Sequence, residues 1–597
     1  MELLNLDGVI EKGVFEIPSY QRGYAWQERQ LKDFWNDLEH VSKLGDKFHY
    51  MHSLTLRELE NEFEDSAFEI IDGQQRLATS LILLGLLAKT TQNKDPKYSL
   101  INLEPILSYK YYGLSEAFRA IMGEEKDLEA FKTSFYAKNL IEAYAFFQEK
   151  ISNTPMETLE KMFDALIKKM LFSVVELNDN RIDPFSSFET INNRGKDLST
   201  LELLKNRLHF VAHKICDEED LENLQQEIND TYTRIYYDLR RFEDDHLESF
   251  LKHFVAYYYG ENSKFKERLL NTAFDAHKKY DDLYDEYEKI NDLLLHLSYS
   301  SKVWYFLHTL DDEELRIEIT PKMRGLLDKM RRLNALSENA FLPLLLSLLT
   351  IQLVGRSANE QVYTTQELEG LLEYLERFGF LIYGVAGKNT AKNEWIGLAF
   401  MAFKAYREGE GNITIEYLPP LEKHFFNRQN NSALELLEEN VHSKKNTEKW
   451  YRWDKALNYL LYEYELYHNP ETTLNFDGSI ESIEHILPQK PDQGYSAKEK
   501  SWAKNSHIVH ALGNLLLIPK NANSSLSNKP FEEKRKAYLK GSYSEKEVAK
   551  NASFGVVEIQ ERSEKLLDFL IARYRIAELV GESAIKTFKN ALLKEIK

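Results

Sequence analysis

Residues 68–84 read FEIIDGQQRLATSLILL, a short apolar run followed by a polar turn and a longer apolar run. The first run suits a buried strand, and the second is long enough for a helix. The stretch therefore predicts a strand that passes through a tight turn into a helix. Because the first N–H groups of a helix lack partners within it and lie at the positive end of its dipole, such a turn is typical of phosphate-binding sites.

Two interpretations of this turn stay open on the residues alone. In one, Asp72 holds a divalent cation that bridges phosphate groups, and Arg76 pairs with a phosphate in bidentate fashion. In the other, Asp72 is the N-cap of the helix and Gln75, at its third position, completes a capping box. The spacing alone favours the capping box.

The segments before this turn have α/β character. Residues 14–26 (VFEIPSYQRGYAW) begin extended, because Pro18 disfavours helical geometry at Ile17. Residues 28–41 carry apolar side chains at helical spacing, and residues 52–59 alternate like a strand. We therefore expect an α/β fold for the N-terminal region.

The YQR motif follows the rigid proline, and further aromatic residues alternate with it. Its members are Tyr20, Gln21 and Arg22. An arginine among amphipathic aromatic side chains suits a nucleotide or base pocket. Tyrosine and tryptophan equally fill protein cores with their polar tips satisfied, so the motif alone does not decide between the two.

The composition of the 597-residue chain bounds its class. The length predicts about three or four domains, and 43% hydrophobic with 29% charged residues indicates a globular protein. The net charge of −20 argues against binding nucleic acid by bulk attraction and leaves a local basic groove open. A single cysteine, Cys216, excludes a disulfide framework and fits a reducing cytoplasm.

Targeting and membrane signals are not expected. The first residues carry acidic groups and no apolar core of a secretion signal. The most apolar run, residues 340–355, is shorter than the ~20 residues that a membrane span needs and contains a proline. It is therefore expected to be a buried helix, and the protein is expected to be cytoplasmic.

The middle of the chain, from about residue 125 to 470, shows almost only helical patterns. One interruption, residues 183–206, contains turn residues at 192–195. Within it, Ser199 and Glu202 predict a capping box for the helix that follows.

Two motifs are set aside. Residues 384–390 (GVAGKNT) lack the spacer of a phosphate loop. The HIVH stretch, residues 507–510, has a histidine spacing seen in zinc sites, but no cysteine or second histidine pair accompanies it. It is interpreted as a partly exposed strand.

After about residue 470 the composition changes. Pro, Gly, Asn and Ser cluster, the β-like run GNLLLIP appears, and helices follow. This indicates a separate C-terminal domain, closed by residues 559–576 as a final amphipathic helix.

Two stretches of this domain carry polar residues that suit phosphodiester chemistry. SIEHILPQK places Glu484 beside His485; Asn514 follows His485 by 29 residues, and Asn523 follows Asn514 by nine. This order resembles the HNH, or ββα-metal, nuclease motif. There a strand carries an acid–histidine pair, a second strand carries an asparagine, and a helix carries a histidine or asparagine.

The chemistry needs this set of residues. His485, neutral near pH 7, takes the proton of the attacking water. Glu484 and Asn523 offer hard oxygen ligands suited to Mg²⁺ or Mn²⁺, which stabilises the phosphate and the leaving oxygen. Asn514 braces the loop and orients His485. All four are predicted catalytic residues, and Glu484 and Asn523 are the predicted metal ligands.

Cations near these residues are expected to form a local basic surface for the DNA backbone. They are Lys520, Lys529, Lys534, Arg535 and Lys536. In the alternative interpretation, all of the residues in this region are ordinary polar surface groups.

Over nearly its full length, the chain resembles the GmrSD-type, or type IV, modification-dependent restriction endonucleases. FEIPSYQRGYAW, IIDGQQRLATS and FETINNRGKDLSTLELLKN are similar to the ParB- and sulfiredoxin-like N-terminal domain of that family, and the HNH stretches are similar to its nuclease domain. The resemblance implies a multidomain, predominantly α protein. Its expected parts are a ParB/sulfiredoxin-like α/β nucleotide-binding domain (1–210), a helical middle domain (211–440) and a C-terminal HNH-type, ββα-metal nuclease domain with flanking helices (441–597).

In this family the N-terminal domain binds and hydrolyses a nucleoside triphosphate, whose state regulates the nuclease, and the target is modified phage DNA. Carried over to this chain, the nucleotide-binding residues are Asp72, Gly73, Gln74, Gln75, Arg76, Tyr20, Gln21 and Arg22, with Arg194 and Lys205 as further neighbours. The sequence departs from the family at LATS, where threonines are usual, and at His52–Ser53, where a Gly-Ser pair is usual. His52 is a candidate for narrowing the nucleotide pocket.

The leading hypothesis is an NTP-regulated, metal-dependent HNH endonuclease with triphosphatase activity, which cleaves modified phage DNA in bacterial antiviral defence. The alternative is a nucleotide-switched DNA-binding protein with a degenerate HNH fold and no cleavage activity. RNA also stays open as a substrate. The sequence does not name the DNA modification, the nucleotide or the direction of its effect, and it leaves a homo-oligomer open.

Overall fold

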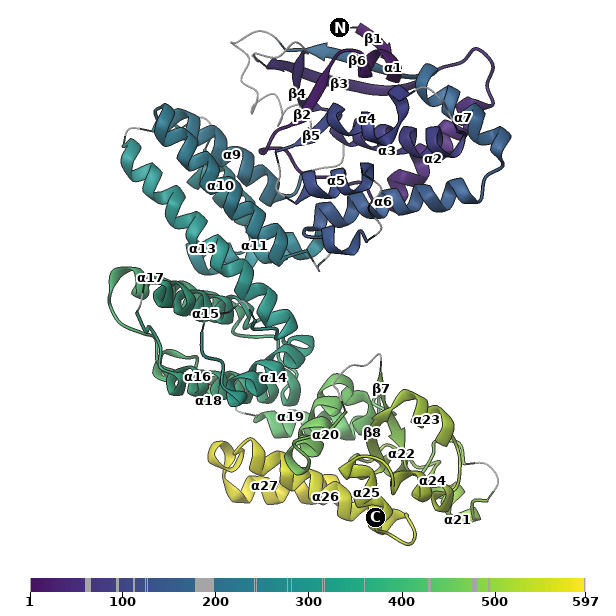
Figure 1. The fold of residues 1–597 in the computed structure, drawn as a ribbon. Helices are drawn as coiled ribbons and strands as arrows, with labels where there is room; N and C mark the ends of the chain where they lie inside the picture. The colour runs from purple at the N-terminus through teal and green to yellow at the C-terminus, as the bar shows by residue number, and fades with distance from the viewer. Residues whose placement is uncertain are drawn as a thin grey trace. The chain divides into compact units, whose positions relative to one another are not determined.

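The computed structural model describes residues 2–596. The exceptions within this range are residues 60–65, 93–95, 111–112, 124, 126, 178–197, 241, 243, 276–277, 281, 314, 316, 359, 428–430, 475–479, 492–493 and 595. The described residues are mostly helical, with a small mixed sheet near the N-terminus (Figure 1). They divide into two compact units, one of residues 1–315 and 349–358 and one of residues 316–348 and 359–597. The three-domain division drawn from the sequence stays a prediction.

Six strands form the sheet of the first unit, in the order β1-β6-β3-β4-β2-β5. Their bounds are β1 Glu2–Asn5, β2 Val14–Ile17, β3 His49–Leu59, β4 Ala67–Asp72, β5 Leu107–Tyr109 and β6 Met170–Glu176. β2 runs parallel to both β4 and β5, whereas β3 is antiparallel to β4 and parallel to β6. The carboxyl ends of β2 and β4 therefore meet at one edge of the sheet, where open α/β sheets bind their ligands.

Helix α3 (Gln74–Thr90) forms the core beside this sheet. Nearly all of its residues are buried, which is expected of a helix that is apolar all round. It contacts α6 (Phe135–Ser152) and α7 (Met156–Lys168), and α7 also contacts α2 (Glu28–Ser42) (Figure 1). The predicted strand, turn and helix around DGQQR, and the predicted α/β character of this region, are confirmed.

The other helices of the first unit include a group that packs together: α9, α10, α11 and α13. The bounds are α1 Leu6–Ile10, α4 Leu100–Leu103, α5 Leu114–Met122, α9 Thr200–Ile215, α10 Glu218–Asp238, α11 Asp244–Tyr259, α12 Phe265–Glu267 and α13 Leu283–Thr309. Helix α9 begins with the predicted capping box: Glu202 N donates to Ser199 Oγ at 3.2 Å, and Ser199 N donates to Glu202 Oε2 at 2.6 Å.

The second unit is built mainly from helices. Their bounds are α14 Pro321–Ser337, α16 Thr365–Phe378, α17 Lys392–Glu408, α18 Leu421–Phe425, α19 Ala433–His442, α20 Asp454–His468, α21 Ala497–Trp502, α22 Ser506–Val509, α23 Lys520–Leu526, α24 Phe531–Tyr538, α25 Tyr543–Ala549, α26 Val556–Arg573 and α27 Ala577–Lys594. Because α27 follows α26, the prediction that residues 559–576 form the final helix of the C-terminal domain was wrong.

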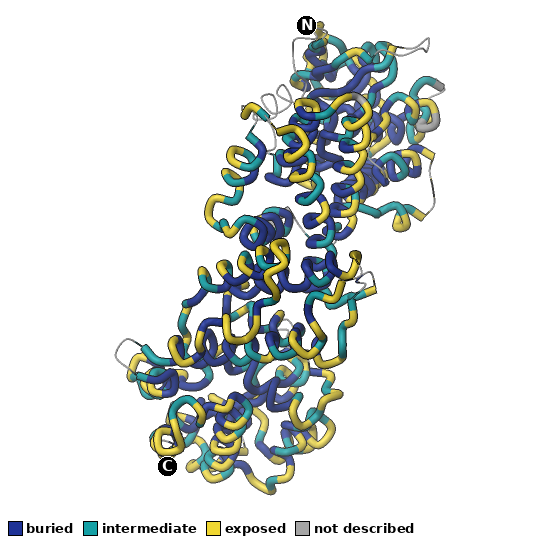
Figure 2. The backbone as a smooth tube through the Cα atoms, turned by 90° about the vertical axis from the view of Figure 1, so that its left-hand side faces the viewer, coloured by how far each residue is buried: buried dark blue, intermediate teal, exposed yellow. Residues whose placement is uncertain are grey.

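The apolar run near residue 350 is helix α15 (Leu342–Ser357), and it is buried as predicted. Among the described residues, none of the helices has the length and apolar character to cross a membrane. Figure 2 shows how burial follows the chain, with exposed residues on outward turns of the helices and buried residues inside.

A buried ionic cluster joins four helices of the second unit. Arg573 of α26 lies 3.1 Å from Glu376 of α16 and 3.2 Å from Glu463 of α20. Lys329 of α14 also pairs with Glu463, at 2.7 Å, and the hydroxyl group of Tyr459 donates to Glu376. Burial raises the pKa of Glu376, and the Arg573 guanidinium opposes that rise.

Helix α26 is also tied to the segment before strand β8 (Leu515–Pro519). The Arg562 guanidinium is buried, and its Nη1 donates to the carbonyl oxygens of Gly513 and Leu515 at 2.9 and 2.8 Å. A Cβ atom at Gly513 would lie 2.0 Å from the carbonyl oxygen of Ile559 in α26. Only glycine allows this close approach of the two backbones.

Candidate functional site

A ββα unit lies in the C-terminal part of the chain. Strand β7 (Glu481–His485) pairs antiparallel with β8, and α23 follows β8 directly and contacts both strands (Figure 1). Glu484 and His485 lie at the end of β7, Asn514 lies immediately before β8, and Asn523 lies on α23. The described order of strand, strand and helix is the one that the resemblance to the HNH motif implies.

His485 is only 7% exposed and contacts three side chains. Its Nε2 lies 3.0 Å from Nδ1 of His510, and its Nδ1 lies 3.3 Å from the amide nitrogen of Gln489. The ring of Tyr451 lies 4.9 Å from the imidazole. Burial, followed by His510 and Lys534, lowers the pKa of His485 to about 3, so the ring is neutral at physiological pH.

The interpretation of HIVH as a partly exposed strand was wrong. Residues 506–509 form the short helix α22, and His510 follows it, 9% exposed and bonded to His485. The partner lies 25 positions earlier in the chain, so the sequence spacing carried no sign of the contact. The sequence feature that could have indicated this contact was the pair of histidines at 507 and 510, shortly before the predicted site residue Asn514.

Asn514 is fully buried and makes three side-chain hydrogen bonds. Its Oδ1 accepts from Leu487 N at 2.7 Å, and its Nδ2 donates to the carbonyl oxygens of Leu487 and Val509 at 2.9 and 2.7 Å. In addition, Ile486 N donates to the backbone oxygen of Asn514. Asn514 thus holds the loop after His485 and the residue before His510, which is the bracing expected of it.

Glu484 is held by two groups from α24. Its Oε1 accepts from Lys534 Nζ at 2.6 Å and from the Tyr538 hydroxyl group at 2.9 Å, and Lys534 Nζ also donates to His485 O at 2.8 Å. Burial raises the pKa of Glu484 and lowers the pKa of Lys534, and in each case the partner's charge opposes the shift.

Lys534 is fully buried, so the prediction that it belongs to the DNA-facing basic surface was wrong. The physical reason is its pairing with Glu484, which a pattern of charged residues in sequence does not reveal. Arg535 is half-buried and its Nε donates to Ala549 O. Lys520, Lys529 and Lys536 are exposed, as a basic surface requires.

Asn523 joins α23 to β7. Its Nδ2 donates to Ser482 Oγ at 2.8 Å and to Ile483 O at 3.1 Å. The described residues contain no group of three or more His, Cys, Asp or Glu side chains arranged to hold a metal ion. The Glu484 carboxylate faces the Lys534 ammonium, so these residues as placed do not fit a metal, and the assignment of Glu484 and Asn523 as ligands of Mg²⁺ or Mn²⁺ stays a prediction.

The DGQQR turn is not a capping box, so that interpretation was wrong. The N-cap of α3 is Gly73, with φ of +100°, and Asp72 is the last residue of β4. The Asp72 Oδ2 accepts from Ser53 Oγ at 3.1 Å and from Arg76 Nη2 at 3.0 Å. The left-handed backbone at Gly73 separates Asp72 from the helix by one residue, so the Asp72 carboxylate binds these side chains and the helix N-terminus stays without a side-chain cap.

Ser53 reaches this pair from β3 because of an irregularity in the strand. The register of β3 against β6 shifts between Tyr50 and Ser53, and His52 between them has φ of +64°. Ser53 O accepts from Arg76 Nη2 at 2.8 Å. The His52 side chain is exposed and lies beside the Tyr50 ring, at 5.3 Å between centroids.

The segment that carries the YQR motif contacts the segment that carries the DGQQR turn. Gln75 accepts from Ala25 N and donates to Gly23 O, both at 2.8 Å. Gln21 Nε2 donates to Ile70 O of β4, and Tyr20 packs against Ile71. The two motifs, which lie about 50 residues apart in sequence, therefore form one continuous structure at the strand ends.

Three buried polar atoms in this region lack a hydrogen-bond partner among the described residues: Gln21 Oε1, Arg22 Nε and Gln74 Oε1. Unpaired buried polar groups are costly, so their presence fits a bound ligand that supplies donors and acceptors. Lys205 is also buried, and burial lowers its pKa well below the usual value. Arg194 lies outside the described residues.

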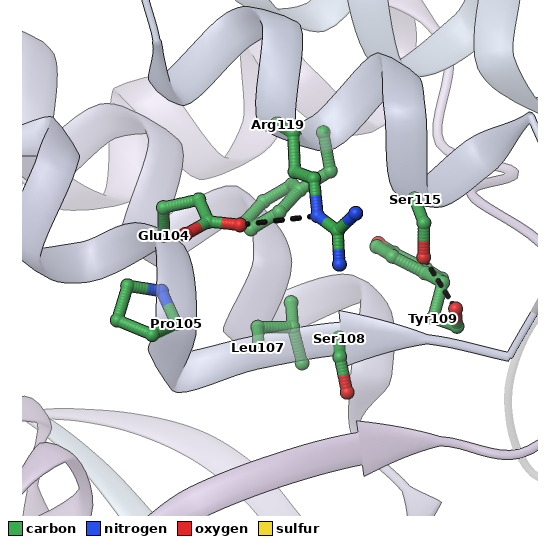
Figure 3. A pocket seen from close by; sticks show the side chains of 8 residues that line it. Glu104, Pro105, Leu107, Ser108, Tyr109, Ser115 and Arg119 are labelled. Atoms are coloured by element: carbon green, nitrogen blue, oxygen red, sulfur yellow. Dashed lines mark hydrogen bonds and ion pairs between the residues drawn. The ribbon is translucent and has the colours of Figure 1, made fainter.

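Two cavities of the first unit are lined in part by residues of its sheet. One, of about 440 Å³, is lined by Tyr20, by the paired side chains Glu69 and Arg57, and by His209 of α9. The other, of about 240 Å³, is lined by Glu104 and Arg119, which pair at 3.3 Å, and by Tyr109, whose carbonyl accepts from Ser115 (Figure 3). The first cavity includes a predicted nucleotide-site residue, and the second includes none of them.

Family models match both ends of the chain. Residues 3–209 match the GmrSD restriction endonuclease N-terminal domain, and residues 437–569 match the GmrSD restriction endonuclease C-terminal domain. The first match contains the DGQQR turn and the second contains the ββα unit, which together define the class as a restriction endonuclease. The chain belongs to the GmrSD restriction endonuclease family. A search of curated proteins gives no match to it.

Proposed function

We propose that this chain is an NTP-regulated, metal-dependent endonuclease that cleaves modified phage DNA in the bacterial cytoplasm as an antiviral defence. The observation that carries the proposal is the ββα unit, with His485 at the end of its first strand and Asn514 holding the loop that follows. In the first unit, Gln21, Arg22 and Gln74 each have a buried polar atom without a hydrogen-bond partner among the described residues. The family match supports the restriction activity, and the regulation and chemistry rest on these sites.

In the proposed cleavage step, His485 takes the proton of the attacking water. Its neutral ring suits a general base, because a protonated imidazole has no lone pair to offer. Asn514 keeps the loops that flank His485 in place. The exposed lysines Lys520, Lys529 and Lys536 offer contacts to the DNA backbone.

A divalent cation, Mg²⁺ or Mn²⁺, would supply charge stabilisation of the scissile phosphate when bound. The Glu484 carboxylate pairs with the Lys534 ammonium, so as placed it does not bind a cation.

At the N-terminal site, the proposed ligand is a nucleoside triphosphate. Arg22 and Arg76 offer guanidinium donors to phosphate oxygens, and the uncapped N-terminus of α3 offers backbone N–H groups. Gln21 and Gln74 offer buried carbonyl oxygens that suit ribose hydroxyl groups or base amines. Asp72 and Ser53 position Arg76.

The test is a cleavage assay on plasmid DNA and on DNA carrying methylated, glucosylated or sulfur-modified sites, with and without Mg²⁺ and each nucleoside triphosphate. Wild-type protein is expected to cleave at least one modified DNA, and His485→Ala is expected to abolish cleavage and to retain nucleotide hydrolysis. Full cleavage by His485→Ala would overturn the assignment.

One observation favours the second candidate, a nucleotide-switched DNA-binding protein with a degenerate HNH fold. The carboxylate predicted to bind metal is paired with a buried lysine. Such a protein would retain DNA in the presence of Mg²⁺ and nucleotide without nicking any modified substrate. The same assay, read by gel shift and by nicking, separates the two candidates.

A further inference from the structure

His510 contacts the proposed general base at a single, well-defined point. Its Nδ1 lies 3.0 Å from Nε2 of His485, and the two rings lie 5.1 Å apart at an interplanar angle of 79°. Both imidazoles are almost fully buried. The contact is therefore a hydrogen bond between two ring nitrogens, made by buried imidazoles.

The surroundings fix this contact in place. Tyr451 lies over both rings, 4.9 Å from His485 and 5.8 Å from His510, and it stacks on the latter at 25°. Asn514 bonds both to Leu487, two residues after His485, and to Val509, next to His510. One buried side chain thus clamps the loops that carry the two histidines.

The hydrogen bonds assign the tautomer of His485. The Gln489 amide nitrogen, a donor, lies 3.3 Å from Nδ1, so Nδ1 accepts and the ring proton is on Nε2. The Nε2–H then donates to Nδ1 of His510. Since Gln489 is exposed and its contact is the longer one, Nδ1 is the His485 nitrogen on the side that a water molecule can reach.

We propose that His510 is a positioning residue for the proposed nuclease: by accepting the Nε2–H of His485, it keeps the lone pair on Nδ1, where the attacking water takes the place of the Gln489 amide. During cleavage the water proton transfers to Nδ1 as the water oxygen bonds to phosphorus, the P–O ester bond breaks, and the leaving oxygen takes a proton from solvent. The resulting imidazolium keeps its hydrogen bond to His510. This inference rests on the proposed function, because it assigns a role only if His485 is the base.

The experiment compares His485→Ala, His510→Ala, His510→Asn and His510→Gln in the full-length protein on a susceptible modified DNA. Asparagine places an amide oxygen near the position of Nδ1, whereas glutamine extends past it. We expect His510→Asn to keep kcat within about threefold of wild type. His510→Ala and His510→Gln are expected to lose kcat by about 10–100-fold, the usual effect of removing a group that orients a catalytic imidazole, with DNA affinity unchanged.

A second readout does not depend on cleavage. Nitrogen-15 NMR of histidine-labelled protein reports which ring nitrogen carries the proton, with His485→Ala used to assign the signal. The Nε2–H form is expected in wild type and in His510→Asn, and a mixture of tautomers in His510→Gln. If His510→Ala does not fold, the role of His510 is tested by the tautomers and the kcat values of His510→Asn and His510→Gln.

The outcomes separate the two proposals. Retained cleavage in His485→Ala overturns the proposed function. Loss of cleavage in His485→Ala together with wild-type kcat in His510→Gln overturns the role of His510 alone. Equal loss in His510→Asn and His510→Gln, with both proteins folded, also overturns it, because an acceptor at the Nδ1 position would then be without effect.

Discussion

The ammonium group of Lys534 lies 2.6 Å from Oε1 of Glu484, and neither side chain reaches solvent. Removal of one partner from such a pair leaves a buried charge uncompensated, which costs about 3–5 kcal/mol of folding free energy. Lys534→Met is therefore expected to lower the urea midpoint strongly. The double variant Lys534→Met/Glu484→Gln, which removes both charges, is expected to recover much of the loss. Equal destabilisation in the single and double variants would contradict the pairing.

Arg76→Ala is expected to reduce nucleoside triphosphate hydrolysis about tenfold or more, equivalent to at least about 1.4 kcal/mol of transition-state stabilisation. The reason is the loss of a guanidinium that Asp72 and Ser53 hold at the N-terminus of α3. Phosphate release measures the effect. Arg29→Ala, at an exposed position of α2, is the matched control and is expected to turn over at the wild-type rate. Unchanged turnover in Arg76→Ala would remove this loop from the nucleotide site.

The rate of DNA cleavage is not expected to fall as the pH is lowered through 6.5. Burial, His510 and Lys534 disfavour the imidazolium and lower the pKa of His485 from 6.5 to about 3, so the base stays neutral from pH 5 to 8. Measurement of kcat across that range checks this. A rate that falls with a midpoint near 6.5 would mean that His485 titrates as a solvated imidazole when DNA is bound.

The same shift predicts a pH dependence of stability. Below pH 6.5 the unfolded chain protonates His485 while the folded chain does not, so folding stability falls as the pH drops from 6.5 toward 3. The slope for one group is about 1.4 kcal/mol per pH unit. Urea unfolding at pH 7 and pH 5 is expected to show a smaller loss in His485→Asn than in wild type.

Chelation tests the metal prediction. Cleavage is expected to stop in EDTA and to return with Mg²⁺ or Mn²⁺, because a divalent cation offsets the charge that develops on the phosphate. Undiminished cleavage in EDTA would exclude the metal-dependent mechanism.

The parts of the site that follow from local sequence were predictable. The Ser199 capping box depends on residues three positions apart, and it is present as expected. The ββα order was implied by the resemblance of the stretches around His485, Asn514 and Asn523 to the HNH motif, and strand β7, strand β8 and helix α23 follow that order.

The parts set by long-range contacts were not predictable. The spacing of Asp72 suited an N-cap. In the structure, the Asp72 carboxylate instead accepts a hydrogen bond from Ser53 of another strand, and Gly73, with a left-handed backbone, is the N-cap. Lys534 was predicted to be a surface cation. Its burial depends on pairing with Glu484, which lies fifty positions away, and the local sequence does not show that contact. His510 was set aside for the same reason, since its partner is distant in sequence.

The hydrogen bonds from Arg562 to the carbonyl groups of Gly513 and Leu515 join segments that the ribosome makes at different times. The strand pair that carries His485 is translated well before α26, because Arg562 lies 47 positions beyond Leu515. A nascent chain that has emerged only as far as β8 lacks the guanidinium that satisfies these two carbonyl groups. The hydrogen bonds around the ββα unit are therefore complete only after α26 has been made.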